Sequence, residues 1–90
     1  MRIKSGYVIR NIASETIVVP TGEVAIHFNG IITLNKTGKV LFSALQTEKT
    51  IDELVDLLYS QFDVSRENAL KDIVDFVQVL NQNHLLVEHD

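Results

Sequence analysis

Residues 31–41 have the sequence IITLNKTGKVL, and the pattern of side chains in this stretch changes at Asn35. The four residues before Asn35 form an apolar, β-branched run that is typical of a strand. Beyond Asn35 the apolar side chains recur with helical spacing and share one face: Val40, Leu41, Ala44 and Leu45. The Asn35 side chain can accept a hydrogen bond from a free backbone N–H of the first turn, so we expect it to cap this helix.

Upstream of this stretch the chain has the composition of strands. Residues 7–12 and 16–19 are rich in β-branched and aromatic side chains, and residues 13–15 between them are short enough for a hairpin turn. Pro20 and Gly22 then end the second strand, because proline and glycine interrupt extended runs. With residues 31–34 as the third strand, we predict an antiparallel sheet of three strands.

The stretch from Glu23 to Phe28 has two alternative assignments. Asn29-Gly30 between two apolar runs is typical of a two-residue hairpin turn, which would make residues 24–28 a strand. A helical turn that begins after Gly22 fits the same residues, since the period of a short apolar run does not separate strand from helix. Both assignments stay open.

Capping residues mark two further helices. Thr50 and Glu53 have the spacing of a capping box, in which each side chain binds the backbone N–H of the other residue. An amphipathic stripe follows this box: Ile51, Leu54, Val55, Leu58 and Phe62. After a break, Ser65 can cap a third helix that covers residues 66–83.

The change of pattern at Asn35 defines the fold class. We predict an α+β, winged-helix-like fold in which an N-terminal three-stranded antiparallel sheet is followed by three helices. We expect residues 1–90 to form a single domain, because one core commonly serves about 50–200 residues. The predicted core draws on the third strand and all three helices: Leu34, Leu45, Leu54, Leu58, Ile73, Phe76 and Leu80.

The third helix has a wider apolar arc than packing on one layer needs. At about 100° per residue its apolar side chains cover about 160°, whereas a single layer needs about 100°. The core accounts for one part of this arc: Ala69, Ile73, Phe76 and Leu80. Leu70 and Val74 lie on a flank, with Asn81 between them. Either a small domain wraps both sides of this helix, or the flank lines a groove for a partner.

Composition limits the classes of function. Hydrophobic residues make up 46% of the chain and charged residues 22%, so the chain can fold around its own core. The absence of cysteine excludes disulfides and thiolate metal ligands and fits a reducing compartment. No apolar run approaches the length of about 18 residues that spans a bilayer, and the N-terminus lacks a signal-peptide pattern. We therefore expect a cytoplasmic protein with no membrane partner.

No constellation of residues indicates catalysis or a cofactor. No serine has a histidine close to it in sequence, and the four glycines are too scattered for a phosphate-binding loop. His84, Glu88 and His89 resemble a metal cluster, but they lie at a terminus, where ligand geometry is poorly fixed. We expect no catalytic residue, no metal and no cofactor.

Several short motifs occur in a fixed order along residues 7–87. They are Val18-Val19-Pro20-Thr21-Gly22-Glu23, Phe28-Asn29-Gly30, Leu34-Asn35-Lys36-Thr37-Gly38, Phe42, Thr50 with Glu53-Leu54, Phe62-Asp63-Val64, Asp72 with Phe76, and Leu85-Leu86. In this order they resemble the PqqD family, the peptide chaperones also called RiPP recognition elements. His84 departs from the family, which usually has glycine there, and we expect Asn83 to take the left-handed conformation that ends the helix instead.

The resemblance implies a binding function and no enzyme activity. Family members bind the leader segment of a ribosomally made precursor peptide and present it to a modifying enzyme, often a radical SAM enzyme. The resemblance implies that the leader adds as a strand beside the third strand, against the third helix, which agrees with an unpaired sheet edge and a spare apolar flank. The predicted peptide-binding residues are Ile31, Ile32, Thr33, Leu34, Leu70, Val74, Val77 and Asn81.

Two binding alternatives compete with this interpretation. A second copy of the chain could pair with the same sheet edge and form a homodimer. Helices beside a hairpin also suggest a winged-helix DNA-binding protein, whose third helix would enter the groove. That helix carries two basic and three acidic side chains, and the whole chain has a net charge of −4. DNA affinity rests largely on neutralising phosphates, so we expect no nucleic-acid partner.

Overall fold

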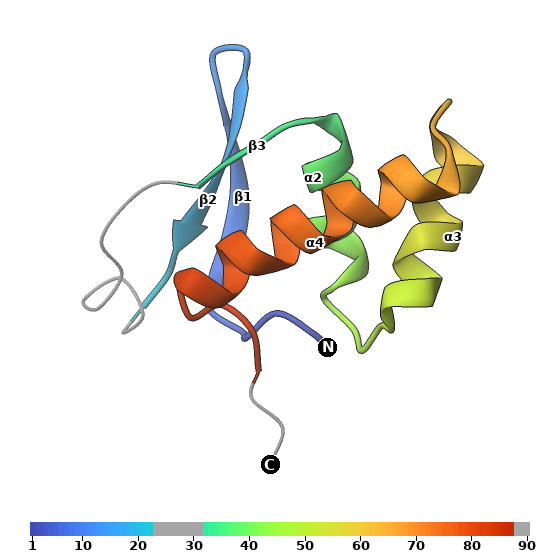
Figure 1. Ribbon diagram of the computed structural model, residues 1–90. Coiled ribbons are helices and arrows are strands. Elements are labelled where there is room, and N and C mark those ends of the chain that lie inside the picture. The colour runs from blue at the N-terminus through green and yellow to red at the C-terminus, as the bar shows by residue number, and fades with distance from the viewer. Residues whose placement is uncertain (23–31, 88–90) are drawn as a thin grey trace.

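The computed structural model describes residues 1–22 and 32–87, which form an α+β fold (Figure 1). Its elements in chain order are β1 (Tyr7–Ile12), β2 (Glu15–Pro20), β3 (Ile32–Leu34), α2 (Lys36–Ala44), α3 (Ile51–Gln61) and α4 (Arg66–Gln82). The predicted order, three strands followed by three helices, is confirmed within these residues. Ile31 and the ambiguous stretch from Glu23 to Phe28 lie outside the described residues.

The sheet is antiparallel, with its strands in the order β1-β2-β3. Ile12 pairs with Glu15, so the hairpin turns on Ala13 and Ser14 alone. Ala13 has a φ of 56°, in the left-handed region that tight hairpin turns require at their first central residue. The β1–β2 hairpin projects beyond the helices (Figure 1), which leaves β3 as the strand nearest to them.

All three helices begin at the predicted capping residues. The Oδ1 atom of Asn35 accepts a hydrogen bond from the Gly38 N–H at 2.8 Å, and the Ser65 hydroxyl caps α4 in the same way. Thr50 and Glu53 form the reciprocal capping box, with N···O distances of 3.0 and 3.1 Å. These bonds satisfy backbone donors that the first turn of a helix leaves without a partner, so local chemistry fixes where each helix starts.

α4 ends in a Schellman motif with His84 in the left-handed conformation. The His84 N–H donates to the Asn81 carbonyl at 3.1 Å, and the Leu85 N–H donates to the Leu80 carbonyl at 2.9 Å. His84 has a φ of 61° and Asn83 a φ of −99°, so the prediction that Asn83 is the left-handed residue was wrong. The motif puts the left-handed residue one position after the C-cap, and here Asn83 is the C-cap itself.

The two terminal segments lie side by side and close the bottom of the core (Figure 1). The Ile3 N–H donates to the Leu45 carbonyl at 2.8 Å, and Ile3 also forms a β-bridge with Leu86. The Lys4 N–H donates to the Leu85 carbonyl at 2.7 Å. Ile3 and Leu85 are both buried. The N-terminal segment is therefore part of the core, a contact that the sequence pattern did not predict.

The core lies between the sheet and the helices. Six of the seven predicted core side chains are buried: Leu34, Leu45, Leu54, Leu58, Ile73 and Leu80. The seventh side chain, Phe76, was predicted to be buried, but it is only partly buried and packs at the margin of the core. One side of its ring faces a hollow between β3 and α4, so the ring belongs partly to the core and partly to the surface.

Candidate functional site

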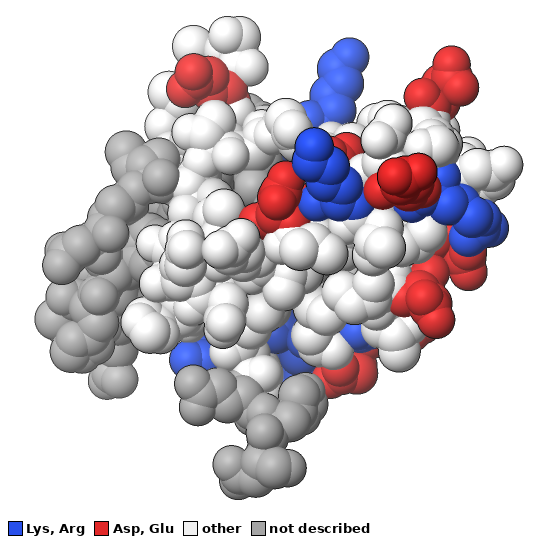
Figure 2. Space-filling view, viewed as in Figure 1, with Lys and Arg blue, Asp and Glu red and all other residues white. Residues whose placement is uncertain are grey.

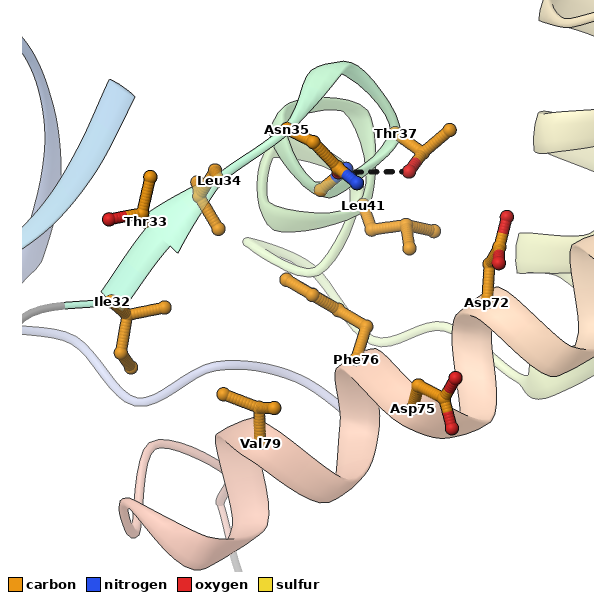
Figure 3. A pocket seen from close by; sticks show the side chains of 11 residues that line it. Ile32, Thr33, Leu34, Asn35, Thr37, Leu41, Asp72, Asp75, Phe76 and Val79 are labelled. Carbon is orange, nitrogen blue, oxygen red and sulfur yellow. Dashed lines mark hydrogen bonds between the residues drawn. The ribbon is translucent and has the colours of Figure 1, made fainter. Parts of the chain in front are cut away.

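A hollow of about 440 Å³ opens between β3, the start of α2 and α4 (Figure 3). β3 lines it with Ile32 and Leu34, which are buried, and with Thr33, which is exposed. This alternation is expected of a strand with one face on the core. In the described residues β3 pairs only with β2. The N–H and C=O groups on the other edge of β3 therefore have no strand partner there and can accept one.

The start of α2 forms a second wall of the hollow. The Asn35 Oδ1 atom accepts hydrogen bonds from the Gly38 N–H at 2.8 Å and from the Thr37 hydroxyl at 3.0 Å. A Cβ atom on Gly38 would lie 3.1 Å from that Oδ1 atom and 3.4 Å from Leu34 Cδ2. Glycine at this position lets the cap approach the helix closely, and the capped turn fixes where β3 ends and α2 begins.

One stripe of α4 forms the third wall: Asp72, Asp75, Phe76 and Val79. These residues stand at positions i, i+3, i+4 and i+7 and therefore share a face of the helix. Phe76 points from α4 toward β3 and α2 (Figure 3). Val79 is 39% exposed, and both carboxylates are also exposed. The wall is apolar toward the C-terminal end of α4 and acidic toward its middle.

The structure brings together the strand half of the predicted site but not the helix half. Ile32, Thr33 and Leu34 line the hollow, and Ile31 lies outside the described residues. Four predicted residues of α4 do not line the hollow: Leu70, Val74, Val77 and Asn81. Val77 packs against the core, whereas Leu70 and Val74 are 43% and 51% exposed. No finding tests whether these four residues bind a peptide, so that part of the site stays a prediction.

The flank that carries Leu70 and Val74 begins beside α3, not beside β3. The Arg66 guanidinium lies 4.6 Å from the centroid of the Tyr59 ring, and its Nη1 atom donates to Asp56 at 2.7 Å. The hydrogen bond to Asp56 raises the pKa of Arg66. Leu70 follows Arg66 by one helical turn and so shares its side of α4. This flank therefore starts at the α3 contact, and neither Leu70 nor Val74 lines the hollow beside β3.

The apolar pattern of α4 did not predict which of its residues line the hollow. Two of these residues are acidic, so the stripe does not stand out on a hydrophobic wheel, and Phe76 was assigned wholly to the core. The signal that could have found it is the Asp72-x-x-x-Phe76 motif, extended by Val79 at the same helical spacing.

The hollow is suited to binding an extended ligand. The edge of β3 that has no strand partner in the described part of the chain offers backbone hydrogen bonds, and the apolar wall beside it offers a surface for side chains. Within residues 1–22 and 32–87, no three acidic or histidine side chains are placed to hold a metal ion. Glu88 and His89 lie outside those residues, so the prediction about them is not tested. No helix of the described part has the length and apolar character to cross a membrane.

The fold and the hollow define a class of protein: a small winged-helix-like domain in which one strand of the sheet borders a surface hollow. The sequence model of the family described as Coenzyme PQQ synthesis protein D (PqqD) matches residues 11–86. The chain therefore belongs to the PqqD family, as the order of its motifs predicted.

A solved structure shares this fold. The structure of TbiB1 in complex with the TbiA(beta) leader peptide matches with a TM-score of 0.74 and 23% sequence identity, over 100% of this chain and 99% of that chain. No curated protein matches the chain in sequence. The structural match confirms the arrangement of strands and helices predicted from the sequence.

Proposed function

We propose that this protein binds the leader segment of a ribosomally synthesised precursor peptide and presents that peptide to a modifying enzyme. The observation that carries the proposal is the edge of β3 that has no strand partner within residues 1–22 and 32–87, beside the hollow lined by Leu34, Phe76 and Val79. Membership of the PqqD family supports it, and so does the leader peptide bound to TbiB1, a protein of the same fold.

The peptide would add as a strand to β3. Main-chain hydrogen bonds to β3 would hold it in register, and alternate side chains would enter the hollow. Ile31, Ile32, Thr33 and Leu34 remain the strand half of the proposed site. For the helix half we propose Phe76 and Val79, because they line the hollow, in preference to the flank of Leu70 and Val74.

The protein acts as a binding module in this proposal, and the modifying enzyme, for example a radical SAM enzyme, supplies the chemistry. We propose that the protein binds its peptide in the cytoplasm, where precursor peptides are made. A chain without cysteine forms no disulfides and so needs no oxidising compartment. A homodimer through the β3 edge would occupy the surface that the leader needs, so the two interactions would exclude each other.

The test is a titration of isotope-labelled protein with synthetic leader peptides, taken from short reading frames beside its gene and followed by amide NMR shifts. We expect a saturable response at Ile32, Thr33 and Leu34 and along α4 at Phe76 and Val79. A scrambled peptide of the same composition serves as the control. A response that is equal for both peptides, or that avoids β3, would contradict the proposal.

A further inference from the structure

The hollow has two chemically different ends. Ile32 of β3 and Val79 of α4 lie toward one end, and Asp72 and Thr37 lie toward the other, with Phe76 between them (Figure 3). Figure 2 shows charged side chains of both signs gathered over the N-terminal half of α4, whereas uncharged side chains cover its C-terminal half. A ligand that spans the hollow therefore meets apolar atoms at one end and carboxylates at the other.

Within residues 1–22 and 32–87, the carboxylates of Asp72 and Asp75 have no ion-pair partner. In the part of the chain that the structure describes, the ion pairs join Met1 to Glu48 and Arg66 to Asp56, and neither involves Asp72 or Asp75. The Thr37 hydroxyl donates to Asn35, and no side-chain hydrogen bond among the described residues involves the carboxylate of Asp72 or Asp75. Three lysines stand on the same two helices without lining the hollow: Lys36, Lys39 and Lys71.

The spacing of the two ends fits a peptide in strand conformation. Asp72 and Phe76 are four residues apart on α4, which corresponds to a rise of about 6 Å at 1.5 Å per residue. Alternate residues of a strand lie on one face about 6.6 Å apart. An added strand can therefore direct the side chain of one residue to Asp72 and the side chain two residues later to the apolar surface of Phe76 and Val79.

The direction of the peptide follows from the sheet. All pairs in this sheet are antiparallel, and antiparallel pairing is slightly more stable per residue than parallel pairing. β3 extends from Ile32, opposite Val79, toward Asn35 at the acidic end. An antiparallel partner therefore passes the acidic end first and the apolar end second.

We propose that the leader bound by this protein carries a lysine or arginine two residues before a large apolar residue, with the cation against Asp72 and Asp75 and the apolar side chain over Phe76. This inference rests on the proposed function and adds the chemistry of the recognised segment. Because the carboxylates are exposed, the cation contributes a selectivity of at most about fivefold, which corresponds to the upper end of the range for exposed ion pairs. Added salt reduces this selectivity.

The test is a selection of random ten-residue peptides displayed on phage against the intact chain and two variants. Asp72→Lys reverses the charge inside the hollow, and Glu67→Lys makes the same change at an exposed α4 residue outside it. The parent and Glu67→Lys should enrich a basic residue two positions before an apolar one. Asp72→Lys should enrich an acidic residue at that position. Circular dichroism checks that each variant is folded.

Synthetic peptides with lysine, glutamine or glutamate at the selected position then give the dissociation constants. Binding that is lost with Val79→Asp but indifferent to the charge of the peptide would overturn this inference and leave the proposed function standing. An unchanged preference in Asp72→Lys would have the same meaning. A selection that enriches no peptide bound in the hollow would overturn both proposals.

Discussion

Val79 and Val74 stand on opposite flanks of α4, and only Val79 lines the hollow beside β3. Five helical positions separate them by about 140° around the axis. Both are valines on the surface of one helix, 39% and 51% exposed, so the same substitution at each position can distinguish the two flanks.

We expect Val79→Asp to weaken leader binding at least tenfold and Val74→Asp to leave it unchanged. A carboxylate at position 79 would be buried without a partner under the docked peptide, and tenfold corresponds to about 1.4 kcal/mol. Titration of the leader peptide against both variants measures this, with circular dichroism to confirm folding. If Val74→Asp weakens binding and Val79→Asp does not, the flank predicted from the sequence is the binding surface.

Phe76 should contribute more to peptide binding than to the stability of the fold. Truncating a buried large apolar side chain costs about 2–5 kcal/mol, which we expect for Ile73→Ala because Ile73 is fully buried. Phe76→Ala should cost less, since one side of the ring already faces the hollow. Denaturant melts of both variants compare the free energies of unfolding, and peptide titration should show the larger loss for Phe76→Ala. Equal or greater destabilisation by Phe76→Ala would make Phe76 a core residue after all.

The capped turn at Asn35 should respond to two small changes. Asn35→Ala removes the acceptor for the Gly38 N–H and should destabilise the fold by about 1 kcal/mol. Gly38→Ala would normally favour a helix, but its new methyl group would lie 3.1 Å from Asn35 Oδ1, which two hydrogen bonds hold in place. We therefore expect no gain in the free energy of unfolding from Gly38→Ala. A clear stabilisation in thermal or denaturant melts would show that the cap can move.

His84→Gly should stabilise the protein by about 0.5–1 kcal/mol. A residue with a side chain costs about 1–2 kcal/mol in the left-handed conformation, and the greater freedom of glycine in the unfolded chain offsets part of that gain. His84 is exposed and its φ is 61°, so the substitution removes strain without opening the core. The free energy of unfolding from urea melts tests the sign. His84→Ala, which keeps a Cβ atom, is the control and should show no such gain.

Duplex DNA should not bind specifically. α4 carries two basic and three acidic side chains, so phosphates would be repelled from the helix that would have to enter the groove. A gel-shift titration at physiological ionic strength, with the leader peptide measured in parallel as a positive control, checks this. A tight shift that weakens steeply with salt would favour the DNA-binding alternative.

Local chemistry in the sequence determined where the elements begin. Asn35, Thr50 and Ser65 each supply an oxygen to backbone donors within three residues, and such contacts depend on no distant part of the chain. Runs of β-branched and aromatic residues predicted the sheet, and helical apolar spacing predicted the helices. Six of the seven side chains predicted to form the core are buried. The order of short motifs identified the family before any contact was known.

The tertiary structure alone decided which flank of α4 borders the sheet edge. A helical wheel gives the width of the apolar arc of α4. It does not show which of the two flanks, one on each side of the core-facing residues, borders the sheet. The packing of β3 and α2 against one flank, and of α3 near the other, decides which flank lines a hollow. Apolar patterning also overlooked this wall because Asp72 and Asp75 are exposed carboxylates, which are typical of a solvated helix face; only the folded structure places them in one hollow with the start of α2. The contact of Ile3 with Leu45 and Leu86 depended on the same long-range packing, because no local pattern links residues so far apart in the chain.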